Sequence, residues 1–160
     1  MYIYRHIEET VTKISKMFGA VLITGPRQVG KTTLLKKMMK NITYATLDDP
    51  IMLSSAKEQS GTFFKDNPPP IFVDEIQYDP NLFPYIKMII DSKKKKGQFY
   101  LSGSQLFVMM KNVTESLAGR LGIIELLGLS LREITGVKYN EPFIPTDEYF
   151  TARRKDIKEI

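Results

Sequence analysis

The segment that most constrains this chain is a glycine-rich loop, GPRQVGKT, at residues 25–32. It fits the pattern G-x-x-x-x-G-K-[ST], in which glycines let the backbone curl so that consecutive N–H groups point at phosphate oxygens. A β-branched run, VLIT, precedes the loop at residues 21–24, and a helical pattern follows it from about Lys31 to Lys40. A strand before and a helix after are the context that this motif requires. The chain is therefore predicted to build an α/β core that binds phosphate.

The positions of this loop have expected roles in binding ATP and Mg²⁺. Lys31 is expected to reach the β- and γ-phosphates, and the Thr32 hydroxyl is expected to bind Mg²⁺. The helix that begins near Lys31 aims its positive end at the same anion. A chance glycine-rich turn is the alternative, expected on the order of once in a few hundred chains of this length. The residues predicted to bind the cofactor are Gly25, Pro26, Arg27, Gln28, Val29, Gly30, Lys31, Thr32 and Thr33.

A second apolar run, IFV at residues 71–73, ends in Asp74 and Glu75. Ligands of open α/β sheets bind at the carboxyl ends of the strands, so Asp74 is predicted to hold Mg²⁺ there, directly or through water. Glu75 is the predicted catalytic base, which orients and deprotonates the attacking water. The alternative is a polar strand end without function. The glycine-rich loop 43 residues upstream, counted from Lys31 to Asp74, favours the functional interpretation.

Polar residues near two further predicted strands are weaker candidates. Ser102 and Ser104 lie at the end of a predicted strand over 98–102, where a hydroxyl could sense the γ-phosphate or serve as a turn residue before a helix. Arg120 precedes a predicted strand over 122–126 and could reach a phosphate in a neighbouring copy or form a surface salt bridge. The choice between the two serines stays open. The predicted catalytic set is Glu75, Lys31, Arg120 and Ser104.

Strand-like and helical segments alternate along the chain, which predicts βαβ units and a parallel sheet. The predicted strands cover residues 21–24, 43–47, 71–73, 98–102 and 122–126. The predicted helices cover residues 5–17, 31–40 and 81–92, with a helix-plus-loop region over 51–67 and further helices up to about residue 117. The pattern weakens from Ser130 onward.

Composition excludes several other classes of function. No cysteine is present, so a thiol nucleophile and a cysteine-ligated zinc are excluded, and a single histidine, His6, excludes a His-based triad. No apolar run approaches the roughly 20 residues of a membrane span, so a cytoplasmic protein with no membrane partner is expected. Much of the net charge of +5 comes from a lysine run at 93–96, which is more typical of a solvated turn than of a nucleic-acid surface.

Five motifs, in this order and spacing, resemble the ATP-binding AAA+-type domain of a large bacterial and archaeal ATPase family. They are GPRQVGKTTLL, LDDP, IFVDEIQ, YLSGSQ and ESLAGRLGIIELLGLSLREI, and the resemblance covers about residues 5–135. Full-length members of that family carry a C-terminal domain of unknown function with nuclease-like features. The resemblance implies a three-layer P-loop core, with a five-stranded parallel sheet of order 5-1-4-3-2 and helices on both faces.

The same resemblance implies roles for single residues. It implies a catalytic Glu after the magnesium Asp, the position of Glu75, and an arginine finger that acts in trans at the position of Arg120. Gln77 matches the Asp-Glu-x-Gln pattern of the family. A homo-oligomer formed through Arg120 is therefore an expected assembly.

These observations predict an ATP-binding, Mg²⁺-dependent ATP-hydrolysing domain that drives an attached or partner module. A small P-loop kinase is an alternative, although the Glu75 carboxylate is suited to activating water rather than an acceptor hydroxyl. A non-catalytic nucleotide switch or DNA-tethering module is another alternative. Its only support is the lysine run at 93–96 and a basic tail that contains Arg153, Arg154, Lys155 and Lys158.

The ATP-binding domain is expected to occupy residues 1–135, because the resemblance ends at about residue 135. Related ATPases add a helical lid after this core. Only about thirty residues follow Leu129, so residues 136–160 are expected to be a truncated tail, and hydrolysis is expected to be reduced. A protein or nucleic-acid partner is a further expectation.

Overall fold

The structure is a computed structural model, and it describes residues 2–104 and 116–155. Five strands form one sheet in the order β2-β3-β4-β1-β5, and every neighbouring pair is parallel. Read from β5, this is the order 5-1-4-3-2, which confirms the predicted fold class. The strands are β1 (Ala20–Thr24), β2 (Thr43–Thr46), β3 (Ile71–Asp74), β4 (Phe99–Ser102) and β5 (Leu121–Glu125).

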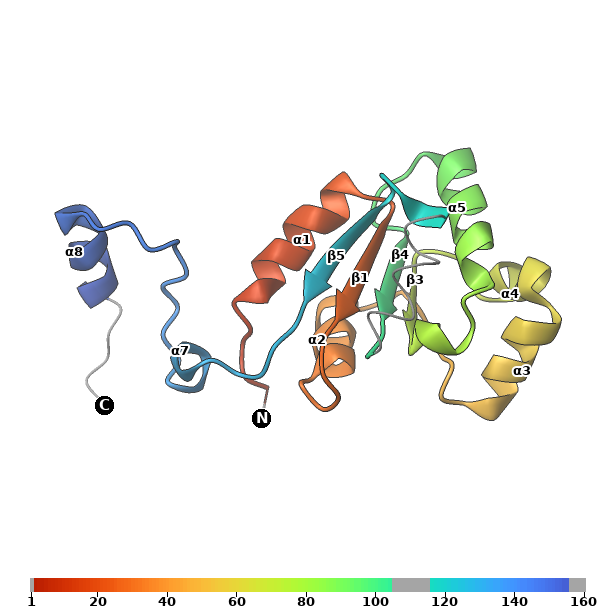
Figure 1. The fold of residues 1–160 in the computed structure, drawn as a ribbon, viewed down its shortest axis with the longest axis horizontal. Helices are drawn as coiled ribbons and strands as arrows, with labels where there is room; N and C mark the ends of the chain where they lie inside the picture. Colours follow the sequence, from red (N-terminus) through yellow and green to blue (C-terminus); the bar gives the residue numbers. More distant parts are fainter. Residues whose placement is uncertain (1, 105–115, 156–160) are drawn as a thin grey trace.

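Helices cover both faces of this sheet and make it the middle of three layers (Figure 1). The helices before and after β1 are α1 (Ile7–Met17) and α2 (Lys31–Met38), and both pack on one face. The opposite face is covered by α3 (Pro50–Glu58), α4 (Ser60–Asp66) and α5 (Leu82–Lys93). A short 3₁₀ turn, η1 (Ile76–Tyr78), joins β3 to α5.

The central strand β1 shows why the sequence forms this arrangement. All five of its residues are buried, and the first four alternate between two hydrophobic cores. Ala20 and Leu22 pack toward α3–α5, and Val21 and Ile23 pack toward α1 and α2. A strand buried on both faces needs apolar residues on both, which is why residues 20–23 form a continuous apolar run instead of an alternating pattern.

The structure adds detail to the predicted elements. The helix-plus-loop region over 51–67 consists of two helices, α3 and α4. The helices predicted up to residue 117 lie largely over 105–115, outside the described residues. No helix in the described part of the chain is long and apolar enough to cross a membrane.

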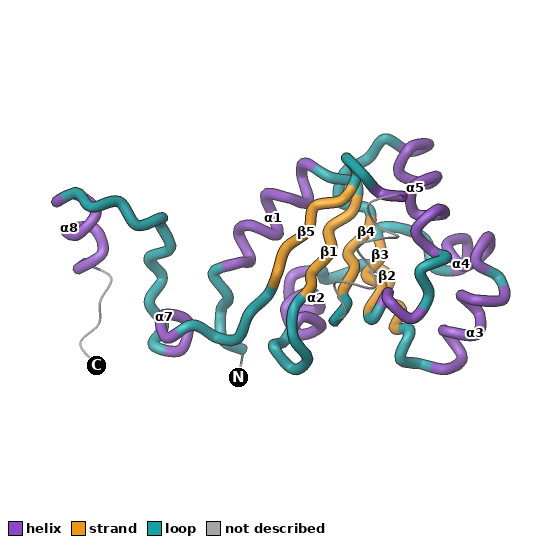
Figure 2. Tube along the Cα trace, viewed as in Figure 1, coloured by secondary structure: helices purple, strands orange, loops and turns teal. Residues whose placement is uncertain are grey.

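Two helices follow β5 that the sequence pattern does not predict, α7 (Leu131–Ile134) and α8 (Asp147–Lys155). Ser130 and Glu133 form a capping box at the start of α7, because each side chain bonds the other residue's backbone N–H. Figure 2 shows α8 lying apart from the sheet, at the end of an extended connection. The domain boundary at residue 135 stays a prediction.

Candidate functional site

The loop between β1 and α2 has the curled backbone that its glycines predict. Gly25 has a φ of 135°, and a Cβ atom there would overlap the carbonyl oxygen of Leu126. Gln28 and Gly30 also have positive φ, at 64° and 94°. Positive-φ residues placed between residues of ordinary φ curl the loop, so that backbone N–H groups turn inward and create a concavity for an anion. The loop therefore has the geometry of a phosphate cradle at the carboxyl end of β1.

Lys31 is the first residue of α2, and its side chain is folded back over this loop. Its Nζ donates hydrogen bonds to the carbonyl oxygens of Gly25, at 3.0 Å, and Pro26, at 2.8 Å. Burial lowers the pKa of Lys31, while the nearby carboxylates of Glu75 and Asp74 act in the opposite direction. The ammonium group is thus held at the phosphate-binding loop, near the carboxylates of Glu75 and Asp74.

Asp74 ends β3 and is buried, with only 4% of its surface exposed. Three hydroxyl groups donate to it: Thr32 Oγ1 to Oδ1 at 3.2 Å, Tyr44 to Oδ2 at 3.3 Å, and Ser102 to Oδ1. Two oxygens that share an edge of an octahedral Mg²⁺ shell lie about 2.9 Å apart, from Mg–O distances of 2.0–2.1 Å. The separation of Thr32 Oγ1 and Asp74 Oδ1 therefore fits the residues of a magnesium site.

Glu75 follows Asp74 in the left-handed backbone region, with a φ of 56°. Its carboxylate Oε2 accepts a hydrogen bond from Nε2 of Gln77, which is buried in η1. Gln77 is the residue that matches the Asp-Glu-x-Gln pattern, for which the sequence suggests no role. In the structure its amide donates a hydrogen bond to Glu75. The two carboxylates of this strand end thus have different surroundings, since Asp74 is enclosed by hydroxyl groups and Glu75 borders a cavity.

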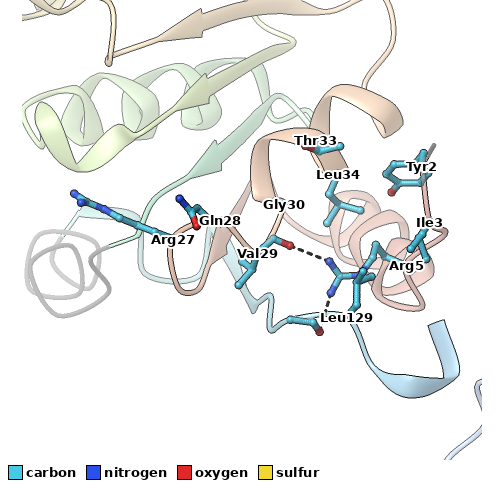
Figure 3. Close-up of a pocket in the computed structure, with 11 residues that line it drawn as sticks. Tyr2, Ile3, Arg5, Arg27, Gln28, Val29, Gly30, Thr33, Leu34 and Leu129 are labelled. Carbon is cyan, nitrogen blue, oxygen red and sulfur yellow. Dashed lines mark hydrogen bonds between the residues drawn. The ribbon is translucent and has the colours of Figure 1, made fainter. Parts of the chain in front are cut away.

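Two cavities adjoin each other along the loop. The first, of about 530 Å³, contains the predicted phosphate-binding groups. It is lined by Arg27, Gln28, Gly30, Lys31, Thr32, Thr33, Asp48, Glu75 and Tyr78. The second, of about 650 Å³, shares four of these residues and extends to the N-terminal segment and the chain after β5 (Figure 3). The residues that line only this second cavity are Tyr2, Ile3, Arg5, Val29, Leu34, Gly128 and Leu129.

The two serine candidates occupy different environments. Ser102 is fully buried and donates to Asp74, whereas Ser104 lies two residues beyond the end of β4 and is half-buried. Of the two, Ser102 is the one that the described contacts connect to the site. A role for either hydroxyl in sensing phosphate stays a prediction.

Arg120 lies far from the loop of its own chain. Its carbonyl accepts from Ala20 N–H at the start of β1, so four residue steps of about 3.3 Å, or roughly 13 Å of strand, separate it from the carboxyl end. Its guanidinium forms a two-bond ion pair with Asp91, with Nε–Oδ1 at 2.6 Å and Nη2–Oδ2 at 3.0 Å. Within one chain, Arg120 therefore forms a surface salt bridge, which was one of its two expected roles. The other role, as an arginine finger that reaches a phosphate in another copy, stays a prediction.

Several residues at the site have no recognisable motif. Tyr44, which donates to Asp74, lies in a short strand, and Tyr78 borders the phosphate cavity from η1. Asp48 borders the same cavity, but it belongs to the LDDP motif. Arg5 borders the second cavity from the segment before α1. For one further residue, Glu133, the sequence did contain a signal, because Ser130-x-x-Glu133 is a capping-box pattern.

A parallel sheet of this order, with a phosphate cradle after β1 and an acidic strand end beside it, defines a P-loop nucleotide-binding domain. The family described as AAA domain matches residues 18–135. The chain belongs to this AAA domain family.

Comparisons with single proteins place the chain among longer relatives. It is similar to two curated proteins, one from Mycobacterium bovis and one from Mycobacterium tuberculosis, both described as uncharacterized. Each is 34% identical over 125 residues, which cover 71% of this chain and 26% of the relative. The chain therefore spans about a quarter of the length of these relatives. Among solved structures, the RuvB Holliday junction branch migration motor of Thermotoga maritima aligns with a TM-score of 0.48 and 19% identity, covering 84% of this chain and 49% of that one.

Proposed function

We propose that this protein binds ATP together with Mg²⁺ and hydrolyses the γ-phosphate, as the motor domain of a longer protein or assembly. The observation that carries the proposal is the convergence of Lys31, Thr32 and Glu75 on one cavity, with Asp74 bonded to Thr32. Membership in the AAA domain family supports it.

The loop and Lys31 would bind the phosphates. In the described state Lys31 Nζ donates to two loop carbonyls, Gly25 and Pro26, and a phosphate would offer it stronger, charged acceptors. The N–H groups of the loop and of the first turn of α2 add further donors to the same anion. Arg27 also borders the cavity and contributes positive charge.

Thr32 and Asp74 would hold Mg²⁺, which supplies charge neutralisation at the β- and γ-phosphates when bound. The hydroxyls of Tyr44 and Ser102 keep the Asp74 carboxylate oriented toward Thr32. Glu75 would accept the proton of the attacking water, and the Gln77 amide would orient its carboxylate. A carboxylate placed to activate water favours hydrolysis over transfer to an acceptor hydroxyl.

The second cavity would receive the adenosine. It adjoins the phosphate cavity through Gly30 and Thr33, and it offers the apolar side chains of Ile3, Leu34 and Leu129 to a planar base. This cavity lies between the N-terminal segment and the chain after β5 (Figure 3), and Asp74 is not among the residues that line it.

An attached module is the proposed target of the ATPase cycle. Support comes from the relatives, in which the matched segment covers only 26% of the length. That this module is nuclease-like rests on the family resemblance alone. Assembly through Arg120 is likewise proposed, because its guanidinium is out of reach of the loop in the same chain.

The proposal is tested by binding of a fluorescent ATP analogue with Mg²⁺ and by release of free phosphate. We expect Lys31→Ala to weaken binding roughly 10- to 100-fold, the range for a lost charged hydrogen bond. We expect Glu75→Gln to bind normally but to release phosphate at least about 100-fold more slowly. Lys57→Ala, which changes an exposed lysine of α3, is the matched control for Lys31.

Different results would identify the alternatives. Unchanged binding in Lys31→Ala contradicts the nucleotide site, and equal rates in Glu75→Gln remove Glu75 from the mechanism. A phosphorylated small molecule with little free phosphate would indicate a kinase. DNA affinity that falls steeply with salt and disappears when residues 93–96 are neutralised would indicate a tethering module.

A further inference from the structure

A buried arginine connects the phosphate loop to the chain that follows β5. Arg5, before α1, is only 6% exposed, and its guanidinium bonds three separate segments. Nη1 donates to the Val29 carbonyl at 3.0 Å, and Nη2 donates to the carbonyls of Leu127 at 2.7 Å and Gly128 at 3.3 Å. Nε donates to Oε1 of Glu133 at 3.0 Å. Figure 3 shows Arg5 between the loop and the segment after β5.

The bond to Val29 fixes one peptide group of the phosphate loop. In a trans peptide, the carbonyl of Val29 and the N–H of Gly30 point in opposite directions. Because Arg5 holds the carbonyl on its own side, the Gly30 N–H points away from Arg5, and Gly30 also lines the cavity that contains Lys31. A rotation of this peptide would present a carbonyl oxygen to an anion. Arg5 therefore opposes the loop conformation that repels phosphate.

Glu133 holds Arg5 from the other side and uses both carboxylate oxygens. Oε1 accepts from Arg5 and from the His6 N–H at 2.9 Å, and Oε2 accepts from the Ser130 N–H at 2.8 Å. Burial by itself raises the pKa of Glu133, but these hydrogen bonds and the charge of Arg5 outweigh burial and lower that pKa. Glu133 is therefore ionised at neutral pH and ties α7 to Arg5.

We propose that Arg5 is a positioning residue that couples α7 to the phosphate loop, through a chain of contacts from Glu133 to Arg5 to Val29. Docking of α7 and the phosphate-binding conformation of the loop then stabilise each other. The inference rests on the proposed function for its ligand, but the coupling between α7 and the loop exists without nucleotide. Any movement of the chain after β5 would change the affinity for phosphate.

The first experiment measures affinity for Mg²⁺-ATP and for inorganic triphosphate. Arg5→Lys retains a charge but lacks the planar fork needed to hold Glu133, Val29 and Leu127 together. Glu133→Gln retains the shape but has one acceptor oxygen where two are in use. We expect each variant to lose about tenfold in affinity, a typical coupling between linked sites, and to lose it equally for both ligands.

Equal losses distinguish the two possible roles of Arg5. If Arg5 only forms a wall for the adenosine, ATP binding weakens and triphosphate binding does not, and the proposal is wrong. The double variant should be no weaker than the poorer single variant, because both changes break the same chain of contacts. Additive losses would overturn the coupling. Glu58→Gln, on the exposed end of α3, is the control and should retain both affinities.

The second experiment needs no nucleotide. Amide hydrogen exchange is measured over the loop in the free protein, comparing Glu133→Gln with Glu58→Gln. We expect faster exchange over residues 28–31 in Glu133→Gln alone, because Val29 loses its anchor although the substitution lies more than a hundred residues away in sequence. Unchanged exchange overturns the coupling. Faster exchange together with no ATP binding by the wild-type protein would retain the coupling and reject the proposed function.

Discussion

At the scale of the residue, the carboxylate of Asp74 shows how this site is prepared. A buried carboxylate is costly unless hydrogen bonds compensate for lost water, and the hydroxyls of Thr32, Tyr44 and Ser102 provide that compensation. They come from a helix and two neighbouring strands. The sheet order places them together, since β3 lies between β2 and β4.

A prediction at this scale concerns the two serines. We expect Ser102→Ala to raise the Mg²⁺ concentration needed for ATP binding roughly tenfold, because a lost supporting hydrogen bond lets Asp74 rotate. Ser104→Ala removes the same hydroxyl two residues away and should leave the Mg²⁺ requirement unchanged. Titration of ATP binding with Mg²⁺ measures both. Equal shifts would show that Ser102 does not act through Asp74.

At the scale of the element, the packing of α1 on β5 depends on one residue without a side chain. Gly122 is buried in β5, and a Cβ atom there would overlap Cγ2 of Ile14 and lie 3.1 Å from Phe18. Since β5 is an edge strand paired only with β1 in the described sheet, α1 is its cover on one face.

We expect Gly122→Ala to lower the free energy of unfolding by about 1–3 kcal/mol, the usual effect of overpacking. Gly128→Ala is the matched control, because no atom lies within 4 Å of its added Cβ. Urea unfolding of both variants measures the difference. A similar stability for the two would mean that α1 moves away from β5 without cost.

At the scale of the whole molecule, the candidate catalytic groups lie at opposite ends of the strands of the sheet. Glu75 and the loop lie at the carboxyl ends of the strands, and Arg120 lies at the amino end of β5, paired with Asp91. One chain cannot bring the two together, whereas two copies in contact could. Arg120 would then exchange an exposed carboxylate partner for a phosphate.

This arrangement predicts complementation between two inactive variants. We expect Arg120→Ala to bind ATP normally but to hydrolyse it at least roughly tenfold more slowly. Mixing it with Glu75→Gln should restore part of the activity, since mixed assemblies contain sites with Glu75 from one copy and Arg120 from the other. Phosphate release by the mixture measures this. A mixture no more active than its components would reject a role for Arg120 in trans.

Local sequence was sufficient to predict the phosphate loop, the strand ending in Asp74 and the alternation of strands and helices. These features depend on neighbours in the chain: glycines that permit positive φ, and apolar runs that must be buried. The strand order was implied only by the family resemblance. The helix α8 and the contacts of Tyr44 and Arg5 had no local signal, because a lone tyrosine in a short strand resembles any other.

The sequence by itself thus determined which groups are available: a cradle for phosphate, Lys31, Thr32 and an acidic strand end. Only the tertiary structure decided which distant residues surround them. Arg5 and Glu133 are separated by 128 positions, yet they share a buried ion pair beside the loop. Such pairing depends on burial and on the meeting of segments in space, which a local pattern does not encode, whereas the curl of a glycine-rich loop is encoded by its own residues.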